Sequence, residues 1–133
     1  MAKTRIKSKI FACTQSAVLA GSIAKYYGVD VGNVIFSRYS DGEFQPSFEE
    51  SVRGNRIFII GSTHPTSENL MEMLLMLDAA KRASARHITA VVPYFGWARQ
   101  DRKDKPRVPI GAKLIAKLLD CLLYTSPSPR DVH

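Results

Sequence analysis

Residues 56–92 read RIFIIGSTHPTSENLMEMLLMLDAAKRASARHITAVV, in which two short apolar runs flank one long amphipathic stretch. The runs Arg56–Ile60 and His87–Val92 have the length and the β-branched content of buried strands. Between them, apolar side chains recur at helical spacing, at Leu70, Met73, Leu74, Leu77 and Ala80. A strand, a helix and another strand in this order are typical of a parallel sheet. We therefore predict an α/β fold, a mostly parallel sheet flanked by helices.

The central helix is predicted to run from Ser67, as its N-cap, to about Ser84. Glu68 in the first turn, and Lys81 and Arg82 near the end, complement the helix dipole. Three further residues widen its apolar face: Met71, Leu75 and Met76. A face of this width indicates burial on more than one side, either in the core or at a subunit interface.

The rest of the chain continues the alternation of strands and helices. The other predicted elements are strands at Ile10–Cys13 and Val34–Arg38, a helix over Gln15–Tyr27 that stops at Gly28, and a last helix over Pro109–Asp120. In that last helix we expect four residues to point inward: Ile110, Leu114, Ile115 and Leu118. Phe44–Phe48 is predicted to be extended, and Pro46 restricts it to a sheet edge or a loop.

The composition fits one soluble domain: 133 residues, of which 45% are hydrophobic and 23% charged. No apolar run approaches the roughly 20 residues of a membrane span, and we predict no secretory signal. Two cysteines, Cys13 and Cys121, suggest neither a disulfide framework nor a zinc site, so we expect a cytoplasmic protein. The net charge of +7 points to an anionic partner: nucleic acid, an acidic surface or a phosphorylated small molecule.

The composition changes abruptly at Cys121, where the sequence continues CLLYTSPSPRDVH to residue 133. This string looks like the translation of a sequencing adapter. We therefore predict that residues 1–120 form the domain and that residues 121–133 are a non-native tail, an adapter read-through scar. A genuine linker rich in proline and serine is the alternative.

Two polar segments follow predicted strands, at the sheet edge where ligands bind in open parallel sheets. In the first, Asp41 and Glu43 can accept hydrogen bonds while Tyr39 stacks on a flat ring; an Asp-Gly turn with solvated acids is the alternative. The second, Gly61–Ser67, is rich in hydroxyls but lacks the glycine and lysine of a Walker sequence, and helix capping explains it. His64 there has no companion at metal-ligand spacing.

A third segment combines aromatic residues with a run of charges, YFGWARQDRKDKPR over residues 94–107. Between Arg99 and Arg107 it holds five cations and two carboxylates. Arginine side chains bind phosphate oxygens in a bidentate manner, so this segment can hold a polyphosphate. Nucleic acid binding and a simple exposed charged loop are the alternatives, although Asp101 and Asp104 would repel a nucleic acid backbone.

Several motifs in register resemble the N-terminal domain of ribose-phosphate pyrophosphokinase over nearly all of residues 9–120. They are YSDGE at 39–43, ESVRG at 50–54, NLME at 69–72, AKRASA at 80–85 and PYFGWARQDR at 93–102. The resemblance implies a phosphoribosyltransferase-like fold. It also implies an enzyme of nucleotide biosynthesis that transfers the terminal diphosphoryl group of ATP to ribose 5-phosphate with Mg²⁺, giving phosphoribosyl pyrophosphate and AMP.

The resemblance also implies roles for individual residues. The ATP-binding residues would be Tyr39, Asp41, Gly42, Glu43, Arg99, Gln100, Asp101 and Arg102, with Lys103 and Asp104 continuing the loop. In this family the acidic pair contacts the adenine end of ATP bound to a neighbouring subunit, so a homo-oligomer is implied. The family commonly has phenylalanine at the position of Tyr39. Candidate residues for an anionic effector are Arg53, Arg82 and Arg107.

The family's metal-binding segment, its catalytic flexible loop and its ribose-phosphate loop have no counterpart in these residues. We therefore assign no catalytic residue and no metal ligand here, and we predict that this polypeptide alone is inactive while its full-length parent is an enzyme. Two alternatives stay open at this point. One is a non-catalytic regulatory relative in the same oligomer, and the other is a nucleic-acid-binding domain, whose binding would fall steeply with salt.

Overall fold

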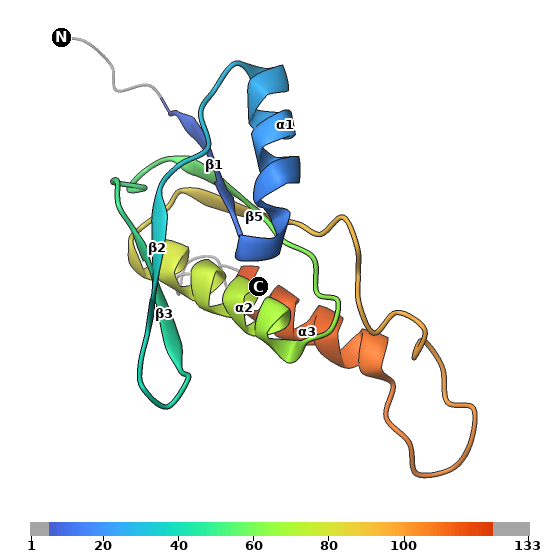
Figure 1. The fold of residues 1–133 in the computed structure, drawn as a ribbon. Helices are drawn as coiled ribbons and strands as arrows, with labels where there is room; N and C mark the ends of the chain where they lie inside the picture. The colour runs from blue at the N-terminus through green and yellow to red at the C-terminus, as the bar shows by residue number, and fades with distance from the viewer. Residues whose placement is uncertain (1–5, 124–133) are drawn as a thin grey trace, which may run out of the picture.

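The computed structural model describes residues 6–123, and Figure 1 shows their arrangement. Five strands and three helices follow one another, with a 3₁₀ turn, η1, before the first helix. In chain order they are β1 (Ser8–Ala12), η1 (Thr14–Ser16), α1 (Ala17–Tyr27), β2 (Val34–Arg38), β3 (Phe44–Phe48), β4 (Arg56–Ile60), α2 (Ser67–Arg82), β5 (His87–Val91) and α3 (Gly111–Leu123). The strands β2 and β4 have the predicted bounds.

Three of the strands form a parallel sheet in the order β1-β4-β5. In Figure 1, α1 lies on one side of this sheet, and α2 and α3 lie on the other. The helix α2 is the connection that joins the parallel neighbours β4 and β5. The predicted α/β class is therefore confirmed.

The strands β2 and β3 form a separate antiparallel hairpin, in which Pro46 lies opposite Phe36. Pro46 lacks the N–H that a central strand would need, and the two-stranded hairpin accommodates it. The hairpin projects from the sheet in Figure 1. Phe48 holds it to β1 through an edge-to-face contact with Phe11, with 4.6 Å between ring centroids.

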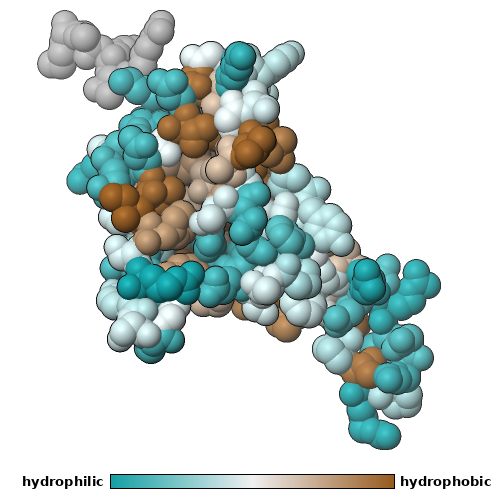
Figure 2. All heavy atoms as spheres, in the orientation of Figure 1, coloured by the Kyte–Doolittle hydropathy of each residue, from teal (hydrophilic) through white to brown (hydrophobic). Residues whose placement is uncertain are grey.

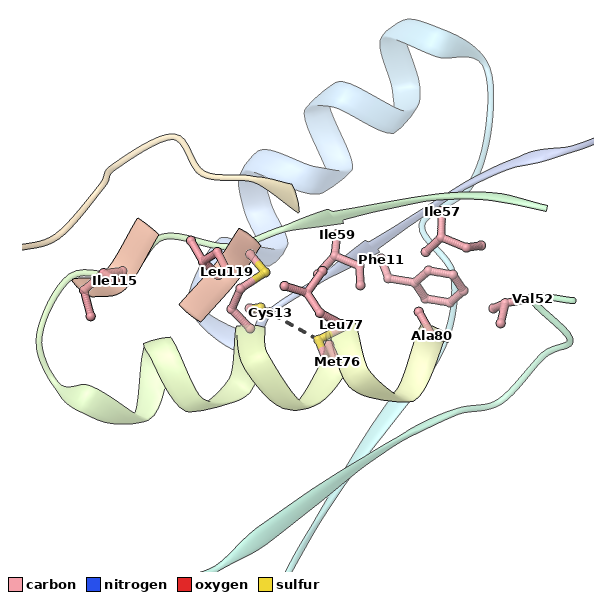
Figure 3. Packing of buried hydrophobic residues seen from close by; sticks show 11 residues of the cluster. Phe11, Cys13, Val52, Ile57, Ile59, Met76, Leu77, Ala80, Ile115 and Leu119 are labelled. Carbon is pink, nitrogen blue, oxygen red and sulfur yellow. Dashed lines mark hydrogen bonds between the residues drawn. The ribbon is translucent and has the colours of Figure 1, made fainter. Parts of the chain in front are cut away.

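The main core lies between α2 and the sheet. Figure 3 shows the buried side chains of Met76, Leu77 and Ala80 facing Phe11 and residues of β4. The predicted buried stripe is only partly right, because Leu70 and Leu74 are half-buried while Asn69 and Glu72 are buried. Compared with the predicted orientation, the first turns of the helix direct Asn69 and Glu72 toward the segments that follow β4 and β1.

Some predicted helix bounds differ from the structure by a few residues. The N-cap of α2 is Thr66 and not Ser67, and neither α2 nor α1 has a side-chain cap hydrogen bond. The helix predicted from Gln15 begins as η1 and becomes α-helical at Ala17. It ends as predicted at Gly28, whose φ of 74° is the left-handed conformation that glycine adopts readily.

The last helix shows the largest difference from prediction. Its buried residues are Gly111, Ile115 and Leu119, whereas Leu114 and Leu118 are 53% and 39% exposed. The helix packs along α2 through one narrow stripe with a spacing of four residues, so the neighbouring leucines face outward.

Two further predictions concern the end of the described chain. The helix α3 continues three residues beyond the predicted Asp120, to Leu123, because Leu122 and Leu123 pack against the core. Residues 124–133 of the predicted tail lie outside the described residues, and the division at residue 120 stays a prediction.

Strand β5 was predicted to be buried, but it lies at the sheet edge and none of its residues is fully buried.

Candidate functional site

The cationic segment forms the loop between β5 and α3, and the core of the sheet anchors its start. The buried Thr63 donates its N–H to the Tyr94 carbonyl at 3.1 Å, and its Oγ1 accepts the Gly96 N–H at 2.9 Å. A Cβ on Gly96 would overlap the Thr63 backbone, so only glycine fits there. Trp97, with φ of 76°, packs against the core and turns the chain outward.

Beyond this anchor, Gln100 connects the loop to α3. Its N–H donates to the Trp97 carbonyl and its own carbonyl accepts the Ala112 N–H, both at 3.0 Å. Its side chain packs on Gly111, where a Cβ would lie 2.5 Å from the Gln100 amide oxygen. The neighbouring residues 99–102 are therefore held between the sheet and the start of α3.

The predicted ATP-binding residues of this loop line one cavity of about 550 Å³. Its walls are Arg99, Gln100, Asp101, Arg102, Asp104, Val108 and Pro109. The guanidinium of Arg102 lies 3.4 Å from the Asp101 carboxylate in an exposed ion pair, a weak interaction that a phosphate can replace. Figure 2 shows the loop as a largely hydrophilic lobe projecting beside α3.

The predicted segment that contains Asp41 and Glu43 forms the turn between β2 and β3. Tyr39 donates its N–H to the Glu43 carbonyl at 2.7 Å, and the Asp41 carboxylate accepts the Glu43 N–H at 3.0 Å. Gly42 has φ of 99°, as such a turn requires. The geometry is thus that of the Asp-Gly turn, with the Glu43 side chain and the ring of Tyr39 exposed.

Arg38 fixes this turn against α2, a role that the sequence patterns did not reveal. Its Nη1 donates to the Gly42 carbonyl at 2.6 Å, and the guanidinium pairs with both oxygens of Glu68, at 3.1 and 3.2 Å. The guanidinium also lies over the ring of Phe44, 5.1 Å from its centroid. The hydrogen bond and charge of Glu68 raise the pKa of Arg38 above its ordinary value.

The structure does not bring the two predicted ATP-binding segments together within one chain. Residues 39–43 do not line the cavity at Arg99–Arg102. In Figure 1 the hairpin turn and the loop before α3 lie on opposite sides of the molecule.

The three candidate effector residues are also divided. Arg53 and Arg82 lie in segments joined by the hydrogen bond from the Gly54 N–H to the Ser84 carbonyl, at 2.9 Å. Both side chains are exposed, and Arg82 pairs with Asp78 at 2.9 Å. Arg107 belongs to the loop before α3, and Figure 1 shows this loop far from the end of α2.

The hydroxyl-rich segment Gly61–Ser67 serves mainly to join elements. The Ser62 Oγ accepts the Tyr94 N–H at 3.2 Å, and Asn69 donates its side-chain amide to the His64 carbonyl at 3.0 Å. In residues 6–123, no three His, Cys, Asp or Glu side chains gather as metal ligands would. Within the same residues, no helix has the length and apolar character needed to cross a membrane.

Sequence reasoning also missed Glu72, which is buried at 7% exposure near the start of α2. Its Oε1 accepts the Thr14 N–H at 2.8 Å. A signal was present, because Glu72 interrupts an apolar run at a position that shares a helix face with Met73 and Met76.

Comparison with known proteins places this geometry in a family. The family described as the N-terminal domain of ribose phosphate pyrophosphokinase matches residues 8–122. A ribose-phosphate pyrophosphokinase of Porphyromonas gingivalis is 56% identical over 124 residues, covering 93% of this chain and 40% of that protein. One of Wolinella succinogenes is 50% identical over 126 residues, covering 94% of this chain and 41% of that protein.

A solved structure gives the same result. The phosphoribosylpyrophosphate synthetase of Mycobacterium smegmatis superimposes with a TM-score of 0.82 at 41% identity, over 87% of this chain and 39% of that one. This chain therefore spans about 40% of the length of the relatives that it matches. The match covers every strand and all but the last residue of α3, and the chain belongs to the family of ribose-phosphate pyrophosphokinase N-terminal domains.

Proposed function

We propose that this chain is the ATP-binding N-terminal domain of an enzyme that transfers diphosphate from ATP to ribose 5-phosphate, giving phosphoribosyl pyrophosphate and AMP. The observation that carries the proposal is the cavity of about 550 Å³ in the loop between β5 and α3, which Arg99, Gln100 and Arg102 line together. Arginine forks match the oxygens of a polyphosphate, and the Gln100 amide adds a neutral hydrogen-bonding group.

Diphosphate transfer depends on positioning and on neutralising charge, and it requires no covalent nucleophile from the protein. The backbone contacts of Thr63 with the loop fix its start, so that Arg99 and Arg102 meet the phosphates with little reorganisation. Mg²⁺ would accompany ATP on its phosphate oxygens, as it does in many phosphate-binding sites, and it would add charge neutralisation. We assign no metal ligand and no catalytic residue to this chain.

We further propose that the hairpin turn completes the ATP site of a neighbouring subunit in a homo-oligomer. The separation of the turn from the cavity in one chain supports this arrangement. Tyr39 offers a half-exposed ring for stacking on adenine, and Asp41 and Glu43 offer acceptors for its amino group. The hydrogen bonds of Arg38 to the Gly42 carbonyl and to Glu68 would hold the turn in position for that contact.

We propose that an anionic effector binds among Arg53, Arg82 and Arg107, and that these residues come from more than one subunit, because the loop that contains Arg107 lies apart from the end of α2. A cytoplasmic location is proposed as well, and the free thiols of Cys13 and Cys121 support it.

The binding proposal is tested by titrating ATP into the chain while following the fluorescence of Trp97, its only tryptophan, two residues before Arg99. Arg99→Ala is expected to weaken binding about tenfold or more, because it removes a charged hydrogen bond to phosphate. Lys113→Ala, which removes an exposed cation from α3, is the control and should bind ATP like the unchanged chain. Equal affinity of the two variants would contradict the proposal.

We also propose that the 133-residue chain by itself does not form phosphoribosyl pyrophosphate, since it spans about 40% of its relatives and holds no assigned catalytic residue. The assay is release of AMP from ATP in the presence of ribose 5-phosphate and Mg²⁺. Turnover above that of a sample without protein would refute this part while leaving ATP binding intact.

A further inference from the structure

A second cavity of about 580 Å³ lies where open α/β sheets commonly bind ligands. Strands β1 and β4 are neighbours, but the chain leaves β1 for α1 on one face of the sheet and leaves β4 for α2 on the other. Such a divergence opens a crevice at the carboxyl ends of the two strands. The cavity is lined there by Thr14 and Gln15, which follow β1, and by His64, which follows β4.

The feature that gives this cavity a chemical character is the carboxylate of Glu72, which lines it although the residue is only 7% exposed. One oxygen is fixed by the Thr14 N–H at 2.8 Å. Within residues 6–123, no Lys, Arg or His nitrogen forms an ion pair with Glu72 and its second oxygen accepts no hydrogen bond. Buried carboxylates are normally paired, so this one is suited to a cationic ligand.

The remaining walls add aromatic surface without adding net positive charge. Phe36 and Phe44 of the hairpin line the cavity together with His64, and ring faces attract organic cations. Arg38 also lines it, but its guanidinium is already paired with Glu68. Arg38 also acts electrostatically on Glu72, but with Glu68 and Glu72 both in the lining the crevice keeps one net negative charge. This charge favours cations and disfavours phosphates.

We propose that this crevice between η1, the start of α2 and the β2–β3 hairpin binds a small organic cation, whose ammonium or amidinium group pairs with Glu72 and whose body lies against Phe36 and Phe44. The site is separate from the proposed ATP cavity, because none of residues 99–102 lines it. It does not depend on the ATP proposal, and either can fail alone.

The test uses benzamidine, a flat aromatic amidinium, titrated into the isotopically labelled 133-residue chain with NMR detection. We expect saturable shifts at the Thr14 backbone amide and the Asn69 side-chain amide, which both border the crevice. Benzamide, which is neutral, and benzoate, which is an anion, are expected to bind at least about tenfold more weakly. This comparison needs no variant and so does not depend on the folding of one.

A variant then assigns the binding to the carboxylate. Glu72→Gln keeps an oxygen for the Thr14 N–H and is expected to weaken benzamidine binding about tenfold or more. Glu49→Gln neutralises an exposed carboxylate outside the crevice and should leave the affinity unchanged. The proposal is overturned by absent or unsaturable shifts, by benzoate binding as tightly as benzamidine, by unchanged affinity in Glu72→Gln, or by displacement of benzamidine by ATP.

Discussion

Cys13 lies at the carboxyl end of β1, against α2, and it illustrates how burial controls the chemistry of one residue. Its Sγ is 3.7 Å from the sulfur of Met76, the contact drawn in Figure 3. Burial, and secondarily the charge of Glu72, raise the pKa of the Cys13 thiol to about 12. Cys13 is part of the hydrophobic core, where it serves packing.

The raised pKa predicts that Cys13 is unreactive in the folded chain. Iodoacetamide at pH 8 should label the exposed Cys121 and leave Cys13 unmodified until the chain unfolds, as peptide mass spectrometry would show. Cys121 is thus the internal control. Labelling of both thiols at similar rates under native conditions would mean that Cys13 is not buried as described.

The same shift gives a pH dependence of stability. Between pH 9.0 and about 12 the folded thiol keeps its proton while the unfolded thiol, with a pKa near 9.0, loses it. The contribution of Cys13 to the free energy of unfolding is therefore complete below pH 9.0. That contribution is lost as the pH rises from 9.0 towards 12. A Cys13→Ala variant should show a smaller fall in the free energy of unfolding over this range than the unchanged chain.

At the scale of elements, strand β4 and helix α3 show what can and cannot be predicted from the sequence. Arg56–Ile60 forms β4 as predicted, because a dense β-branched run between turn residues has few alternatives. In α3 two stripes compete, one through Leu114 and Leu118 and one through Ile115 and Leu119. Periodicity alone does not choose between them; the contact with α2 does.

Core and surface leucines should therefore respond very differently to truncation. Leu77→Ala, at a fully buried position between α2 and the sheet, is expected to lower the free energy of unfolding by about 2–5 kcal/mol. Leu114→Ala, at a position that is 53% exposed, should change it by less than about 1 kcal/mol. Urea denaturation measures both changes. A larger loss of unfolding free energy for Leu114→Ala than for Leu77→Ala would mean that Leu114 points into the core, as the sequence predicted.

The loop before α3 depends on the absence of a side chain at Gly96. Gly96→Ala is expected to destabilise the domain and to weaken ATP binding, because the added Cβ displaces the loop from the Thr63 backbone. Gly21→Ala in α1, where a Cβ meets nothing within 4 Å, is the matched control and should stabilise the chain by about 0.5–1 kcal/mol. Thermal unfolding and ATP titration of both variants decide whether the anchor exists.

The candidate site could be predicted only in part, because the sequence shows local patterns but not the contacts between distant segments. Arginines clustered between Arg99 and Arg107 are visible in the sequence as a charged run. The cavity is not, because it depends on how Trp97 and Gln100 fold the loop onto α3. The crevice at Glu72 depends on three distant segments and on the rotation of α2, so no local pattern reveals it.

For the whole molecule, the net charge of +7 and the separation of the hairpin turn from the loop before α3 bear on how two chains could form one site. Five of the cations lie in the projecting loop, which Figure 2 shows as a hydrophilic lobe, whereas the acidic turn of the hairpin projects elsewhere. Two such chains can bring the turn of one to the loop of the other in a symmetric pair. We propose that one ATP site is built in this way from two chains.

The most direct test is to mix two defective variants and measure ATP binding. Arg99→Ala removes the phosphate contact and Asp41→Asn weakens the acidic turn, so each variant alone should bind ATP weakly. After mixing and exchange of subunits, about a quarter of the sites should regain full affinity, because half of randomly formed pairs are mixed and each mixed pair has one intact site. Recovery at that level is the result we expect; a mixture that binds no more ATP than the two variants measured separately would contradict the claim.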